Sequence, residues 1–199
     1  MNPKNELSLE SIKSAPVPLK LKWLSEGLFV KELKNDKSWR VRLAFANKGL
    51  YLDEYKLDTA DSVRAAVAKH GKFPDELVND KSWKVRLAVA QQGEHLETLM
   101  NDSSELVRLE VLKHDYKPEH FENDPSKIVK LELIKKKLFL DKFSEDLDFE
   151  VRLAVAQQGA NLDKLSNDSE LIVRLETVSK RSQFKLQKTR NYGEKDLDW

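Results

Sequence analysis

The sequence predicts an all-α fold in which short helices repeat along the chain as a solenoid, and three observations predict it. Apolar residues follow helical spacing rather than the alternation typical of strands. Several residue types recur along the chain at one constant spacing, which indicates stacked units that bury a shared core. A valine followed by a basic residue recurs every 22 residues (63 − 41 = 22) in seven copies: Val41, Val63, Val85, Val107, Val129, Val151 and Val173.

Each copy of this motif predicts two helical pieces. An aspartate five residues before the valine is expected to cap the first helix, and in four copies a glycine eight residues after the valine is expected to end it, as at Asp80 and Gly93. About eleven or twelve residues of α-helix fit between these two signals. The remainder of the copy, such as residues 95–100, has room for one α or 3₁₀ turn.

The copies divide the chain into three predicted regions. Residues 19–180 are expected to form the repeat solenoid, with one worn copy followed by seven regular copies. Residues 1–18 and 181–199 depart from the pattern. They are predicted to be an N-terminal cap and a C-terminal cap or tail, because the terminal units of a solenoid present a polar outer face.

The basic residue after each valine and the aspartate before it are predicted to form an internal ladder of ion pairs. At about 100° per residue the basic residue falls within the apolar arc of its helix, where a charge needs a partner. The aspartate of the same helix lies about 9 Å away along the axis and on another side, so the aspartate of an adjacent copy is the expected partner. This structural role is favoured over a row of anion-binding arginines. The ladder residues are Asp36, Asp58, Asp80, Asp102, Asp124, Asp146, Asp168, Arg42, Arg64, Arg86, Arg108, Arg152 and Arg174, with Lys130 in the fifth copy.

Large apolar residues also recur in the two positions directly before the motif valine. They either cover the preceding short helix or lie exposed as anchors for a protein partner. The candidate anchors are Trp39, Trp83, Leu106, Ile128, Phe149 and Ile172.

Lysines at the ends of the longer helices offer an alternative surface that would bind nucleic acid. The helix dipole explains part of this column, and a net charge of +1 gives no overall field that favours phosphate. The candidate phosphate-binding residues are Lys69, Lys113, Lys135, Lys136 and Lys137.

Composition and motifs exclude several other classes of function. With no cysteine, the chain has no thiol nucleophile and no cysteine ligand for zinc or iron–sulfur clusters, and its four histidines lack a recognised ligand spacing. There is no glycine-rich phosphate loop, nucleophile elbow or zinc-protease motif, so we expect no enzyme, cofactor, metal or small-molecule substrate. No apolar run is long enough to span a bilayer, and the first ten residues lack the order of a secretory signal. These features predict a cytoplasmic protein without a membrane partner.

The motif Asn-Asp-x-Ser-Trp-x-Val-Arg-Leu-Ala-Val-Ala-x-x-Gly resembles leucine-rich repeat variant units and the related HEAT-like repeats. It matches residues 79–93, 35–49 and, more loosely, 145–159. The resemblance implies a right-handed superhelix of paired short helices. Family members often have Asn-Pro where this chain has Gln-Gly or Lys-Gly, and the cysteine ligands of some members are missing, so no metal cluster is implied.

Such arrays are mostly binding scaffolds. The sequence therefore predicts a non-enzymatic scaffold that binds a protein partner along an extended repeat surface. The alternative is a HEAT-like array that binds nucleic acid through the lysines at its helix C-termini.

Overall fold

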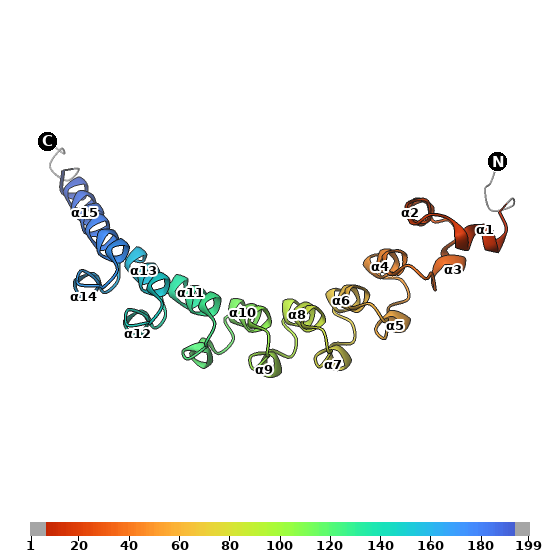
Figure 1. Cartoon of the computed structure of the whole chain (residues 1–199), viewed down its shortest axis with the longest axis horizontal. Helices are drawn as coiled ribbons and strands as arrows, with labels where there is room; N and C mark the ends of the chain where they lie inside the picture. Colours follow the sequence, from red (N-terminus) through yellow and green to blue (C-terminus); the bar gives the residue numbers. More distant parts are fainter. Residues whose placement is uncertain (1–6, 194–199) are drawn as a thin grey trace. The chain divides into compact units, whose positions relative to one another are not determined.

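The computed structural model describes residues 7–193, and the side chains of residues 7–187, and it is all-helical over that range (Figure 1). The prediction of an all-α fold is therefore confirmed for the described residues. Residues 1–6 of the predicted N-terminal cap and residues 194–199 of the predicted tail lie outside them. The helices group into two compact units, one ending at His114 and one beginning at Asp115, and each is described by itself.

The N-terminal unit alternates longer and shorter helices after an opening pair, α1 (Leu9–Ser14) and α2 (Val17–Ser25). Its nine-residue helices are α4 (Trp39–Asn47), α6 (Asp61–Lys69), α8 (Trp83–Gln91) and α10 (Glu105–Lys113). Its four-residue helices are α3 (Val30–Leu33), α5 (Leu52–Tyr55), α7 (Pro74–Leu77) and α9 (Leu96–Leu99). Each longer helix packs on the next, and α5, α7 and α9 lie on one side of the row (Figure 1).

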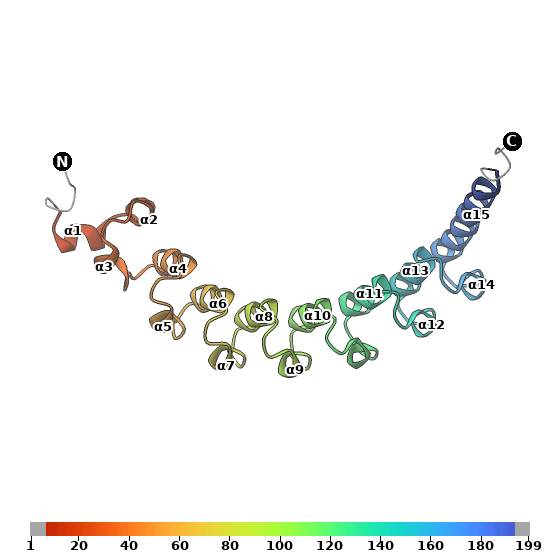
Figure 2. The ribbon, with the colours of Figure 1, turned by 180° about the vertical axis from the view of Figure 1, so that it is seen from behind.

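The C-terminal unit has the same alternation. It consists of the 3₁₀ helix η2 (Pro118–Phe121), α11 (Lys127–Lys135), α12 (Leu140–Phe143), α13 (Phe149–Gln157), α14 (Leu162–Leu165) and α15 (Leu171–Gly193). Figure 2 shows α12 and α14 on one side of the row formed by α11, α13 and α15. Helix α15 continues for 23 residues and runs through Arg181, which occupies the position that Gly159 has after α13. Residue 181, where the predicted tail begins, lies inside this helix.

The core of both units is built from two positions of the motif. The motif valine is completely buried in every copy, as at Val85 and Val151. An apolar residue of each short helix packs beside it, and Leu99 and Phe143 are both 1% exposed. Burial of these two positions in copy after copy fixes which face of each helix points inward.

The longer helices begin later than the sequence predicts, so the prediction that the aspartates are N-caps was wrong. Ser82, not Asp80, is the N-cap residue of α8. The Asp80 Oδ1 instead accepts a hydrogen bond from the Ser82 backbone N–H at 2.8 Å, which forms a turn before the helix. Both carboxylate oxygens also accept from a guanidinium of the preceding copy, and the helix begins after this turn.

Candidate functional site

A series of buried ion pairs connects successive longer helices within each unit, and Arg64 shows its geometry. The Nε and Nη2 atoms of Arg64 donate to Oδ2 and Oδ1 of Asp80 at 2.6 and 2.9 Å. The third nitrogen, Nη1, donates to the backbone oxygen of Asp58 at 2.6 Å. The two side chains are 6% and 9% exposed. One guanidinium thus joins the turn before its own helix to the turn before the next helix through charge-assisted hydrogen bonds.

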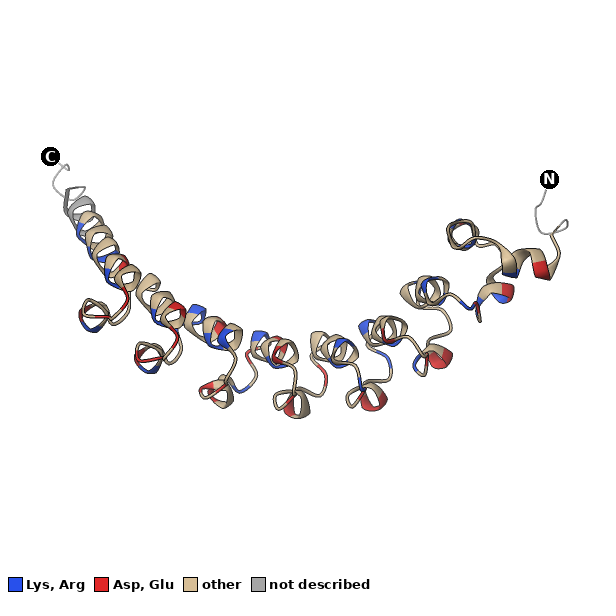
Figure 3. Cartoon of the chain, in the orientation of Figure 1, with Lys and Arg blue, Asp and Glu red and all other residues tan. Residues whose placement is uncertain are grey.

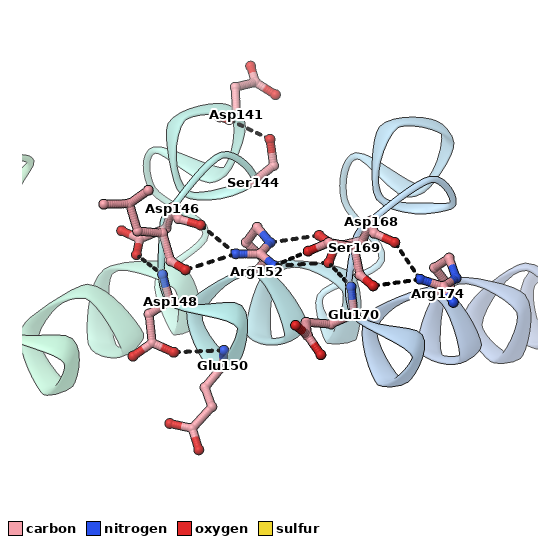
Figure 4. Close-up of polar contacts among 11 residues, drawn as sticks. Asp141, Ser144, Asp146, Asp148, Glu150, Arg152, Asp168, Ser169, Glu170 and Arg174 are labelled. Atoms are coloured by element: carbon pink, nitrogen blue, oxygen red, sulfur yellow. Dashed lines mark hydrogen bonds and ion pairs between the residues drawn. The ribbon is translucent and has the colours of Figure 1, made fainter.

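The same forked contact recurs in other copies. Arg42 binds Asp58, Arg86 binds Asp102, and Arg152 binds Asp168, each with an Nε to Oδ2 distance of 2.6 Å. Figure 4 shows the Arg152 fork between the backbone of its own turn and the Asp168 carboxylate.

Other ladder residues also make polar contacts. Lys130 makes a single contact to Asp146 at 2.7 Å. Arg108 Nη1 donates to the Asp102 backbone oxygen at 2.8 Å. Asp124 is buried, and its Oδ1 accepts from the Ser126 backbone N–H.

One ladder residue was missed by the sequence analysis. Lys20 is 5% exposed, and its Nζ contacts Asp36 Oδ2 at 2.6 Å. The 22-residue step contained the signal, since 42 − 22 = 20. Leu19 takes the place of the motif valine in this worn copy, and Lys20 was therefore left out of the predicted ladder.

Hydrogen bonds from the ladder arginines lower the pKa of three of the aspartates. Burial alone would raise the pKa of Asp58 and Asp80, but hydrogen bonds from Arg42 and Arg64, together with one backbone N–H each, hold the pKa of both carboxyls below its ordinary value. The hydrogen bond from Arg152 likewise lowers the pKa of Asp168. Each of these groups binds a proton more weakly in the folded chain than in the unfolded chain.

We therefore expect the protein to lose stability in acid. A carboxyl whose pKa in the folded chain lies below its unfolded value of about 3.9 stabilises the fold. This contribution is complete above the unfolded pKa and is lost as the pH falls through the folded pKa. Melting temperatures followed by circular dichroism should be level from about pH 7 to about pH 5 and fall steadily below about pH 4. A melting temperature that stays constant down to about pH 2 would contradict this expectation.

The candidate protein anchors lie at the start of the longer helices and remain partly exposed. In the N-terminal unit Trp39, Trp83 and Leu106 are 38–39% exposed. In the C-terminal unit Phe149 and Ile172 are 40% and 52% exposed, and Ile128 is half-buried. The Arg40 guanidinium lies 4.8 Å from the centre of the Trp39 ring, so this ring already has a neighbour over one face.

One of these anchors forms the wall of a groove that crosses α6 between α4 and α8. The groove has a volume of about 410 Å³. Its floor is α6, which has Ser62 and Ala65 where α8 has Lys84 and Leu87 in the corresponding positions. The lining residues are Leu43, Asn47, Ser62, Ala65, Ala66, Lys69, Trp83, Lys84, Leu87 and Gln91. The groove thus brings together the predicted anchor Trp83 and the predicted phosphate-binding residue Lys69.

The other lysines of the alternative surface are mostly engaged. Lys113 contacts Glu110 at 3.2 Å, Lys135 contacts Glu132 at 3.4 Å, and Lys136 contacts Asp115 at 2.5 Å. Lys137 follows α11 with a φ of 60°. The short helices also carry acidic residues in their first turns, and Asp53 and Asp75 there are exposed (Figure 3).

Comparison with family models, with curated proteins and with solved structures finds no match for this chain. The likeness to leucine-rich repeat variant units therefore stays a prediction from the sequence. None of the helices in residues 7–193 combines the length and the apolar character that crossing a bilayer requires. Among the described side chains, no three histidines, aspartates or glutamates are grouped so as to hold a metal ion.

Proposed function

We propose that this chain is a non-enzymatic scaffold that binds a partner protein across the exposed side of its longer helices. The groove over α6 carries the proposal, because it joins an exposed aromatic ring to aliphatic walls within one depression. We further propose that the helices follow a right-handed α-solenoid of 22-residue repeats, as the sequence motif implies. Location in the cytoplasm stays a prediction.

The composition of the groove favours a protein segment as its ligand. Protein interfaces are typically built around aromatic anchors with a polar rim, and here Trp83 and Leu87 face Leu43 across the small side chain of Ala65. The amides of Asn47 and Gln91 line the groove as well and offer both donors and acceptors. A partner side chain of moderate size, apolar and inserted over Ala65, suits this arrangement.

The charges at the groove favour a partner with an acidic residue beside that apolar one. Lys69 lines the groove, is exposed, and is the last residue of α6. The helix dipole has its negative end there, so the positive charge at this point comes from the Lys69 side chain alone. Lys84 contacts Asp61 at 3.3 Å and is therefore already balanced. We expect Lys69 to select an acidic partner residue by charge complementarity.

Nucleic acid has less support as the ligand. Three of the five candidate phosphate-binding lysines contact carboxylates, and binding to a phosphate backbone requires several free cations along one surface.

A photoreactive phenylalanine analogue in place of Ser62 provides the test, because a partner that occupies the groove is crosslinked there and can be identified. The affinity of that partner is then measured for the wild type and for Ala65→Leu. Leucine occupies the corresponding positions of α4 and α8, so this variant should fold while filling the groove. We expect Ala65→Leu to weaken binding about tenfold or more, which corresponds to about 1.4 kcal/mol.

Leu57→Ser is the matched control, since Leu57 is 80% exposed and does not line the groove. It should leave the affinity unchanged. Equal affinities for the wild type and Ala65→Leu would reject the groove as the binding site. Binding to duplex DNA or RNA that weakens steeply with salt in a mobility-shift titration would favour the alternative function.

A further inference from the structure

The last longer helix, α15, has an apolar face that is covered in the preceding copies. The residue five positions after the motif valine is 1% exposed at Ile134 in α11 and 0% exposed at Ala156 in α13. The corresponding residue of α15, Val178, is 60% exposed. Leu175, two residues after the motif valine, is 58% exposed, whereas Leu153 in α13 is half-buried.

These residues share one side of α15 with Leu171 and Arg174. Positions separated by three, four and seven residues lie on the same side of a helix, which brings Leu171, Arg174, Leu175 and Val178 together. Leu171 is 59% exposed. We call these four residues the α15 face. A cluster of exposed apolar residues on one side of a helix indicates an interaction site.

Arg174 makes the backbone contacts of Arg152 but, within residues 7–187, not its contacts to a carboxylate. Its Nη1 donates to the backbone oxygens of Asp168 and Ser169 at 2.6 and 2.9 Å, as Arg152 Nη1 does to its own turn (Figure 4). Arg152 also holds the carboxylate of Asp168, 16 residues further along, through Nε and Nη2. Among the described side chains, no carboxylate contacts Nε or Nη2 of Arg174, and the residue 16 positions later is Arg190.

The geometry points to a second binding site: we propose that the α15 face docks a helix of a partner protein that presents an aspartate just before its first turn. The carboxylate would accept from Nε and Nη2 of Arg174, since a guanidinium held by its third nitrogen matches a carboxylate with two parallel hydrogen bonds. Apolar residues of the partner helix would cover Leu175 and Val178. Helix α15 docks on α13 in this way, with Asp168 on Arg152.

The chain's own first copies do not offer this aspartate, which argues against a second copy as the occupant. The residue one step of 22 before Asp36 is Ser14 (36 − 22 = 14). Asp36 itself is held by Lys20. The proposal is separate from the groove over α6 and does not depend on the proposed function, because the two sites lie in different units.

A peptide of residues 146–158, held helical by a side-chain staple on its outward face, is the probe. It contains Asp146 and the apolar residues that follow it. It is titrated against the full chain labelled with ¹⁵N-arginine, and both the affinity and the Nε–H resonance of Arg174 are followed. The resonance is assigned by its loss in R174Q. We expect saturable binding that shifts this resonance.

Changes on either side of the contact should then weaken binding. An Asp146→Asn peptide, and the chain variants R174Q and V178S, should each bind about tenfold more weakly or worse. R174K should bind with intermediate affinity, because lysine keeps the charge but not the fork. The L57S chain, altered at an exposed leucine of the other unit, should bind like the wild type.

Three outcomes would overturn the proposal. The first is no detectable binding, and the second is equal binding by the wild type and R174Q when circular dichroism shows both folded. The third is self-association of the wild type in light scattering that V178S abolishes, since a second copy would then occupy the face.

Discussion

Replacing Asp80 with alanine is expected to lower the free energy of unfolding by about 3–5 kcal/mol, the range found when one partner of a buried ion pair is removed. The reason is Arg64, whose side chain is 6% exposed and whose Nε and Nη2 would lose their acceptors. The Ser82 backbone N–H would lose its acceptor as well. Urea unfolding followed by circular dichroism measures the change.

Glu54→Ala is the control, because it removes a similar contact at the surface. Glu54 binds Lys34 at 2.9 Å, but the two side chains are 47% and 33% exposed. Solvent screens such a pair, so the loss should be much smaller than that of Asp80→Ala. Equal losses for Asp80→Ala and Glu54→Ala would mean that the ladder does not stabilise the fold beyond ordinary surface pairs.

Phe45→Ala should have the next largest effect, a loss of about 3–5 kcal/mol. Phe45 is completely buried in α4, and its ring centre lies 5.7 Å from that of Tyr51 and 6.4 Å from that of Tyr55. Truncation removes these aromatic contacts and leaves a cavity that the packed helices cannot fully close. The measurement is again the free energy of unfolding in urea.

Phe45→Val serves as the graded comparison, since Val67 and Val89 occupy the same position in α6 and α8. We expect a loss clearly smaller than that of Phe45→Ala, because more of the buried volume is kept. The placement of Phe45 in the core would be contradicted if both variants lost less than about 0.5 kcal/mol of unfolding free energy, which is the range typical of surface changes.

The ladder could be predicted because a strict period fixes the register. Arg64 lies in the apolar arc of its helix, and an aspartate recurs at every step, so the only unknown was which copy supplies the partner. The helix starts could not be predicted in the same way. An aspartate is suited both to cap a helix and to accept from a guanidinium, so the sequence at Asp80 fits either role. Only the fold shows that Asp80 forms a turn before the helix and that Ser82 is the N-cap.

The groove and the α15 face were missed for two different reasons. The groove depends on the relative sizes of side chains in three neighbouring helices, so Ala65 is informative only once it is known to lie between Leu43 and Leu87. The glycine position does not predict the extension of α15, since Asp115 and Lys137 occupy it after α10 and α11 and both of those helices end there, whereas α15 continues through Arg181. The exposure of Val178 follows from the packing of α15, which the sequence pattern alone does not give.

A double-mutant cycle on Arg64 and Asp80 tests most directly whether buried ion pairs hold successive helices together. The free energies of unfolding are compared for the wild type, Arg64→Leu, Asp80→Ala and the double variant. If the forked contact stabilises the packing of α6 against the turn before α8, the coupling free energy should be about 2 kcal/mol or more. A coupling of less than about 0.5 kcal/mol, the value expected for independent sites, would contradict that account.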